Sequence, residues 1–163
     1  MELFEGRESP LYHGTSWVAA AHILEKNEIE ARSYHDASKL LRKTEISDYQ
    51  VAGVSLTRDY RVARTFGEIV FVLDQQKLVT RHEIIPIDFF SKAKFMVGRG
   101  DGGGESEEFV VGPITNLDRY LTEIRITKKW YDANISSERA ERIFTNGVAG
   151  LDLLISHPKL RVV

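Results

Sequence analysis

A histidine and a glutamate stand at the ends of two predicted strands, far apart in the chain. His13 closes the stretch LYH and is followed by Gly14, which lets the backbone approach a ligand. Glu108 opens the apolar stretch EFVV. Taken alone, each has an ordinary explanation, because a strand histidine is usually packed and hydrogen-bonded and an acidic strand end is usually solvated. Taken together, they offer a hydrogen-bonding imidazole and a carboxylate able to stabilise developing positive charge.

A pair of hydroxyls lies between these two positions in the chain. Ser55 and Thr57, in the stretch GVSLT, have the spacing of two that puts both side chains on one face of a strand. Hydroxyls at such positions usually satisfy surface or cap positions. A serine hydrolase would require a second glycine two residues after the serine, as in the G-x-S-x-G elbow, and GVSLT lacks it. The sequence therefore disfavours a hydrolase built on Ser55.

The elements that must position these side chains follow from hydrophobic periodicity. Apolar side chains between residues 17 and 24 recur at helical spacing, after Thr15 or Ser16 as the cap. Val62 and Phe66, one turn apart, predict a short helix. Strands are expected at residues 11–13, 53–57, 69–73, 83–87, 108–111, 121–126 and 160–163, and further helices at 38–43 and 136–148.

Length and composition limit the classes of protein that these elements can build. The chain has 163 residues, of which 42% are hydrophobic, and this predicts one domain over residues 1–163. A net charge of −2 gives no broad attraction to nucleic acid or to an anionic membrane. The sequence has no cysteine, and the longest apolar run, at residues 69–73, is too short to span a bilayer. We therefore expect a cytoplasmic protein that acts without a membrane.

A glycine-rich stretch precedes the glutamate and is expected to be mobile. Residues 97–108 read VGRGDGGGESEE, and their glycines match G-x-G-x-x-G in form. That dinucleotide-binding fingerprint requires a strand before it and a helix at its end, whereas an acidic strand start follows here. We interpret the stretch as a surface loop that delivers a glutamate to a cleft.

The order and spacing of these segments resemble the ADP-ribosyltransferase superfamily. YHGT at residues 12–15 is similar to the first motif of the branch that holds poly(ADP-ribose) polymerases and diphtheria toxin. Glu108 with the apolar strand behind it, followed by the pairs NL at 116–117 and YL at 120–121, is similar to the last motif of that branch. The middle segment departs from it, because Ser55 stands where that branch has a tyrosine that stacks on nicotinamide. It resembles instead the Ser-x-Thr motif of the toxin-like branch, whose first motif begins with arginine.

The resemblance implies a fold, a reaction and a partner. The fold would be of the α+β class, a split two-sheet antiparallel fold with helices flanking an NAD cleft. The enzyme would be a mono-ADP-ribosyltransferase that cleaves NAD at the nicotinamide–ribose bond and transfers ADP-ribose to a macromolecular acceptor, protein being favoured over nucleic acid. NAD would be the substrate, and no metal would be required, since the five histidines show no metal-ligand spacing. A toxin-like or phage-encoded effector, acting in a host cytoplasm, would fit this description.

The resemblance also assigns roles to individual residues. Glu108 would stabilise the oxocarbenium-like transition state, as carboxylates do in glycoside chemistry. The nicotinamide stack would come from Tyr60 or Phe66. Arg58, with Arg61 and Arg64 on the same short helix, would touch the NAD diphosphate or an acidic partner, unless the three only form a solvated helix face. The catalytic residues implied are Glu108, His13 and Ser55, with Glu107 as the alternative glutamate, and the NAD-binding residues implied are His13, Gly14, Thr15, Ser55, Thr57, Arg58, Tyr60 and Phe66.

Several alternatives stay open at this point. If Glu107 were the catalytic residue, ESE at residues 105–107 would match the E-x-E pattern of arginine-modifying transferases. The same cleft could serve a plain NAD glycohydrolase or a catalytically inactive binding module. An RNA 2′-phosphotransferase would be expected to carry more arginines around a phosphate pocket and an added basic domain, and neither is evident in the sequence.

Overall fold

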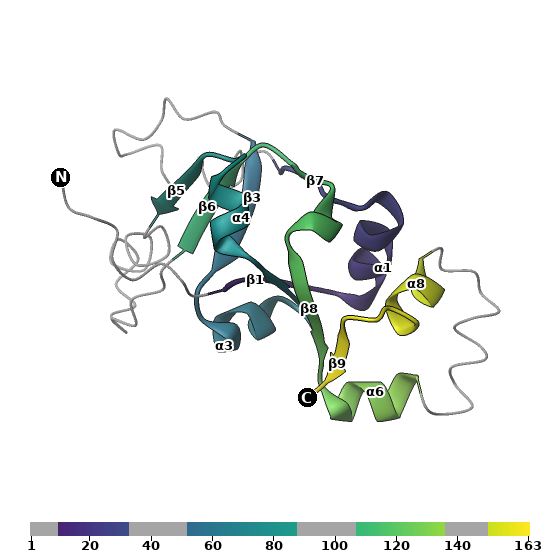
Figure 1. Cartoon of the computed structure of the whole chain (residues 1–163). Helices are drawn as coiled ribbons and strands as arrows, with labels where there is room; N and C mark the ends of the chain where they lie inside the picture. The colour runs from purple at the N-terminus through teal and green to yellow at the C-terminus, as the bar shows by residue number, and fades with distance from the viewer. Residues whose placement is uncertain (1–9, 33–51, 88–106, 136–149) are drawn as a thin grey trace, which may run out of the picture.

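The computed structural model describes residues 10–32, 52–87, 107–135 and 150–163 (Figure 1). The expected helices at 38–43 and 136–148, and residues 97–106 of the glycine-rich stretch, lie outside these residues. The described part is a mixed α+β structure with a mainly antiparallel sheet of seven strands and a small sheet of two. No helix within it is long and apolar enough to cross a lipid bilayer.

The large sheet has the strand order β5-β6-β3-β1-β4-β8-β9, so its two halves meet at β1 and β3 (Figure 1). All neighbouring strands are antiparallel except β8 and β9, which are parallel. The strands of this sheet are β1 (Leu11–Thr15), β3 (Gly53–Thr57), β4 (Ile69–Leu73), β5 (Ile84–Ile87), β6 (Glu107–Val111), β8 (Leu121–Ile126) and β9 (Leu160–Val162). The small sheet pairs β2 (Glu28–Ile29) with β7 (Ile114–Thr115).

Register assigns each side chain to one of two faces, because residues paired across neighbouring strands point to the same side of a sheet. Phe71 at the centre of β4 pairs with His13 on one side and with Ile124 on the other. Val72, the next residue, pairs with Tyr12 and Glu123. We call the face that carries Phe71 the inner face and the face that carries Val72 the outer face.

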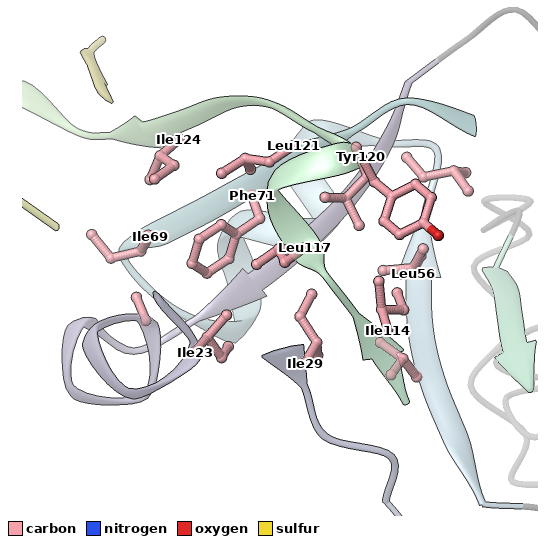
Figure 2. Packing of buried hydrophobic residues seen from close by; sticks show 14 of the residues in the cluster. Ile23, Ile29, Leu56, Ile69, Phe71, Ile114, Leu117, Tyr120, Leu121 and Ile124 are labelled. Carbon is pink, nitrogen blue, oxygen red and sulfur yellow. The ribbon is translucent and has the colours of Figure 1, made fainter. Parts of the chain in front are cut away.

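The inner face carries the main hydrophobic core (Figure 2). Phe71 is fully buried and packs within one cluster with Ile23 from helix α1 (Trp17–Lys26) and with Ile29 and Ile114 from the small sheet. Helix α8 (Leu151–Ile155) adds Leu151 to the same cluster. Burial of each large apolar side chain contributes about 1.5–3 kcal/mol, so this cluster fixes the inner face of the sheet.

The outer face is covered near β1 by the short helix α3 (Tyr60–Ala63) and the 3-10 turn η1 (Arg64–Phe66). Asp59 begins α3 by accepting a hydrogen bond from the backbone amide of Arg61. A Cβ atom on Gly14 would lie 1.7 Å from the carbonyl oxygen of Ala63, so only glycine allows α3 to pack this closely on β1. Tyr60 projects over the same face, with its ring 5.7 Å from that of Tyr12.

Most of the predicted strands are confirmed, with small changes at their ends. The helix expected after Thr15 or Ser16 is α1, and Ser16 is its cap. The helix expected around Val62 and Phe66 is present as α3 followed by η1. The final strand is confirmed as β9, and it extends the large sheet. The elements that periodicity did not predict are short: the strands β2 and β7 of the small sheet, the helices α4 (Gln75–Val79), α6 (Lys128–Asn134) and α8 (Leu151–Ile155), and the turn η2 (Leu117–Arg119).

Candidate functional site

The two halves of the large sheet separate at a fork between β1 and β3. The only register pair that joins these two strands is Tyr12 with Thr57. At the other end of β3, Gly53 exchanges backbone hydrogen bonds with Arg32 instead of with β1. We call this region, where β3 leaves β1 and meets Arg32, the β1–β3 fork.

His13 bridges the β1–β3 fork. Its Nδ1 lies 3.3 Å from the backbone carbonyl oxygen of Ser55, so a protonated Nδ1 donates a hydrogen bond across the opening. Burial lowers the pKa of His13, the hydrogen bond to Ser55 raises it in part, and the nearby positive charge of Arg32 lowers it further. The imidazole is therefore neutral at pH 7. With Nδ1 as the donor, Nε2 is the unprotonated nitrogen and has a lone pair that can accept a hydrogen bond.

Glu108 is a buried carboxylate at the start of β6. Its register partner is Leu56, so the side chain lies on the inner face among apolar neighbours. It is only 1% exposed. A carboxylate at such a position requires a cationic partner, and Arg58 supplies one, with Nη2 donating to Oε1 of Glu108. Arg58 directly follows β3, two residues after Leu56, and its contact with Glu108 places its guanidinium on the same face.

This ion pair is incompletely satisfied. In the described part of the chain, Oε2 of Glu108 and Nε of Arg58 are buried without a hydrogen-bond partner. An unmet buried donor or acceptor costs about 1–3 kcal/mol, so native structures rarely keep one without a functional reason. One acceptor and one donor are thus left for a ligand group that both donates and accepts a hydrogen bond.

His13 and Glu108 share the inner face of the sheet and are separated by β3. The spacing of neighbouring strands, about 4.8 Å, places their backbones roughly 10 Å apart or more, since β1 and β3 diverge at the fork. The structure therefore brings the first and the last of the three sequence segments to one face. A ligand of dinucleotide size is long enough to contact both.

Ser55 does not join them as expected. Its register partner is Phe109, so its side chain is exposed on the outer face while Glu108 lies on the inner face. The Ser55 side chain and the Glu108 carboxylate therefore lie on opposite faces of the sheet, and it is the backbone carbonyl of Ser55 that contacts His13. Thr57 is buried on the outer face, where its hydroxyl accepts a hydrogen bond from the amide of Asp59 and so shapes the turn into α3.

The residues expected to stack on nicotinamide also lie away from Glu108. Tyr60 packs over the outer face, against Tyr12 and beneath the guanidinium of Arg125, which lies 5.0 Å from the ring centre. Tyr60 therefore lies on the opposite face of the sheet from Glu108. Phe66 is 57% exposed on η1. Arg61 pairs with Asp59, and Arg64 lies 5.9 Å from the ring centre of Tyr60.

The remaining predicted residues have backbone roles that the structure defines. Gly14 pairs with Val70 on β4, and the space where its side chain would lie is filled by the backbone of Ala63. Thr15 ends β1 and pairs with Ile69. The register pairs Glu107 with Thr57 and Glu108 with Leu56, so Glu108 is the glutamate that shares a row with the apolar inner face.

The sequence did not predict the roles of two arginines at the site, Arg58 and Arg32. Arg58 was expected to touch the NAD diphosphate or an acidic partner, or to form part of a solvated helix face, and in the structure it pairs with Glu108. Its position two residues after Leu56 is a signal of period two, yet it points to Glu108 only when the register of β3 with β6 is known. Arg32 at the β1–β3 fork carried no sequence signal, because it precedes a long polar stretch.

No protein-family model, curated protein or solved structure matches this chain. Among the described residues, no three His, Asp or Glu side chains gather in a way that could hold a metal ion.

Proposed function

We propose that the chain is an NAD-cleaving ADP-ribosyltransferase whose site lies on the inner face between His13 and Glu108. The observation that carries the proposal is Glu108, a carboxylate that is 1% exposed and that, among the described residues, pairs with one arginine and keeps one oxygen without a hydrogen-bond partner. Buried polar atoms without a hydrogen-bond partner are rare in native structures, so each one calls for an explanation. The mixed α+β fold with a fork between β1 and β3 agrees with the split sheet that the resemblance implies.

The proposed reaction breaks the bond between nicotinamide and the C1 carbon of its ribose. The bonding electron pair leaves with the nicotinamide nitrogen, which becomes neutral, and positive charge develops on the ribose. Glu108 stabilises that charge through a short-range interaction in a site of low dielectric, where such interactions are strong. The nucleophile of the acceptor then bonds to C1 and releases its proton.

His13 holds the substrate in the orientation that this step requires. The hydrogen bond from Nδ1 to the Ser55 carbonyl fixes the ring, and the lowered pKa keeps it neutral, so that Nε2 accepts a hydrogen bond from a ribose hydroxyl. A macromolecule, protein in preference to nucleic acid, supplies the acceptor nucleophile, and water takes its place in a glycohydrolase.

Incubation of the purified protein with labelled NAD, alone and with a cell lysate, tests this proposal. Release of nicotinamide reports cleavage and label on a macromolecule reports transfer. Glu108→Gln keeps the size of the side chain and removes its charge, and we expect it to lower the rate about 100-fold or more. Glu123→Gln is the matched control, because Glu123 also pairs with an arginine but lies on the outer face, and we expect its rate to equal that of the wild type.

Each outcome decides between named functions. Cleavage that is lost in Glu108→Gln and kept in Glu123→Gln supports the proposal, and label on a lysate component supports transfer. Nicotinamide release without label transfer indicates a glycohydrolase. Absence of cleavage by the wild type, together with absence of a thermal shift on adding NAD, overturns the enzymatic proposal and leaves a binding module.

A further inference from the structure

From the contact between Arg58 and Glu108, we infer that Arg58 is a positioning residue that holds Glu108 for the proposed reaction. This inference rests on the proposed function, because it gives Arg58 a role in the reaction that Glu108 is proposed to catalyse. In this role Arg58 contacts Glu108 and not the diphosphate of the substrate. Nη2 of Arg58 donates to Oε1 of Glu108, and both side chains lie on the inner face. The contact holds the carboxylate at one oxygen and leaves Oε2 to meet the substrate.

The difference in burial between the two side chains indicates which residue orients the other. The side chain of Glu108 is 2% exposed and that of Arg58 is 24% exposed, so the arginine brings a charge from the edge of the protein to a carboxylate that water does not reach. Leu56, the register partner of Glu108, and Val110, two residues further along β6, are buried on the same face of the sheet. They offer no hydrogen bond of their own to orient it. Arg58 therefore sets the orientation of the carboxylate.

The backbone around Arg58 is fixed on both sides, which makes it suited to positioning. Before it, Thr57 pairs with Tyr12 and accepts a hydrogen bond through its hydroxyl from the amide of Asp59, at 3.1 Å. After it, Asp59 caps α3 through the amide of Arg61, at 2.8 Å. Arg58 thus projects from a rigid turn. A residue that holds another side chain within a fraction of an ångström of its working geometry requires such a rigid backbone.

A residue that binds the diphosphate and a residue that positions Glu108 give different kinetics. Loss of a diphosphate contact raises the KM for NAD, because the contact is made before and during the reaction alike. Loss of a positioning contact lowers kcat, because it misplaces a group that acts in the transition state, and a misplacement of about 1 Å costs up to about 100-fold.

The test measures kcat and KM for NAD cleavage in the full chain carrying Arg58→Gln, Arg58→Lys, Glu108→Gln, or Arg58→Gln with Glu108→Gln. We expect Arg58→Gln to lower kcat about 10–100-fold, with KM within about threefold of the wild type. Arg58→Lys restores the charge without the planar fork, so it should recover part of kcat. In the Glu108→Gln background, Arg58→Gln should cause no further loss. Arg125→Lys on the outer face is the matched control and should keep the kcat of the wild type.

The outcomes separate this inference from the function on which it rests. If the wild type cleaves NAD but Arg58→Gln raises KM and leaves kcat unchanged, Arg58 binds the diphosphate and the inference is overturned. The same holds if the loss in Arg58→Gln is as large without the Glu108 carboxylate as with it, or if removing Arg58 raises kcat. If the wild type does not cleave NAD, the proposed function itself fails, and the role of Arg58 falls with it. Thermal unfolding and circular dichroism identify a variant that is unfolded, and Arg58→Lys then carries the test.

Discussion

The two faces of the large sheet each carry an arginine–glutamate pair, and the two pairs differ in their glutamates. Arg58 and Arg125 are similarly exposed, at 24% and 28% of their side-chain surface. Glu108 on the inner face is 2% exposed, whereas Glu123 on the outer face is 34% exposed. Water therefore solvates the outer carboxylate and leaves the inner one dependent on its single arginine.

The two arginines also differ in how many of their hydrogen-bonding groups are satisfied by neighbouring residues. Arg125 donates through Nε to Glu123 at 2.7 Å, and its guanidinium lies 5.8 Å from the ring centre of Tyr12 and 5.0 Å from that of Tyr60. That cluster is complete without a ligand, and cation–π contacts of this kind contribute about 0.5–1 kcal/mol. Arg58, by contrast, has a buried Nε that finds no hydrogen-bond partner in the described part of the chain. The comparison teaches that an ion pair with unmet buried atoms is the better indicator of a ligand site.

The largest expected effect comes from filling the space between β1 and α3. Gly14→Val places atoms where the Ala63 carbonyl oxygen now lies, 1.7 Å from a Cβ atom, and we expect it to lower the free energy of unfolding by more than about 3 kcal/mol. Urea unfolding measures the change. Gly112→Ala is the control, because no atom of the described residues lies within 4 Å of its Cβ and its φ of +78° opposes the change by about 1–2 kcal/mol. Equal losses in the two variants would show that α3 does not close the outer face at Gly14.

Removing the inner arginine tests the dependence of Glu108 on it. Arg58→Met leaves a buried carboxylate without its partner, and we expect a loss of about 2–3 kcal/mol in the free energy of unfolding. This is below the range for fully buried pairs because the Arg58 side chain is 24% exposed and partly screened. Adding Glu108→Leu should restore most of the loss, since an apolar pair then fills the same space. Urea unfolding of the two single variants and the double variant supplies the numbers, and a double variant no more stable than Arg58→Met would contradict the account.

A smaller effect concerns the pH dependence of stability through His13. Burial lowers its pKa in the folded state below the ordinary value of 6.5, so the unfolded chain binds more protons between those two values. Stability is therefore full above about pH 6.5 and falls as the pH drops toward the folded pKa. His13→Asn keeps a donor for the Ser55 carbonyl and does not titrate, so the difference in stability between pH 7.5 and pH 5.5 should shrink.

His82 and His157 provide the internal control for that experiment. Burial lowers the pKa of both, so they give stability a pH dependence of the same sign. Part of the slope should therefore remain in His13→Asn. An unchanged slope would show that His13 takes up protons equally in the folded and unfolded states, and the neutral imidazole assigned to the β1–β3 fork would then be wrong.

The sequence predicted the strands of the large sheet well, and the reason is physical. Runs such as IVFVL at residues 69–73 are β-branched and apolar and are buried on both faces, so their composition alone indicates a strand. Helices α4 and α8 have only five residues each, too few for a periodic pattern to stand out. Tertiary packing decides such elements.

The candidate site was predictable in its positions and not in its contacts. Ser55 and Glu108 each carried a correct strand assignment, yet their faces depend on the register of β3 with β6, and a shift of one residue exchanges the faces. No local pattern specifies that register across the 50 residues that separate Arg58 from Glu108 in the chain. The pairing of Arg58 with Glu108, and the exposure of Ser55 on the other face, follow from the same register.

The smallest expected effect sharpens the comparison of the two pairs. Arg125→Met and Glu123→Gln should each change the free energy of unfolding by less than about 1 kcal/mol, because water replaces the lost partner and the Met side chain keeps part of the packing on Tyr12 and Tyr60. A double-mutant cycle on this pair measures its coupling, which we expect to be below about 1 kcal/mol. The same cycle on Arg58 and Glu108 should give a clearly larger value, because the buried carboxylate has no solvent to replace its partner. If the two coupling energies are equal, the burial of Glu108 does not strengthen its interaction with Arg58. The argument that the functional site lies on the inner face would then lose its energetic support.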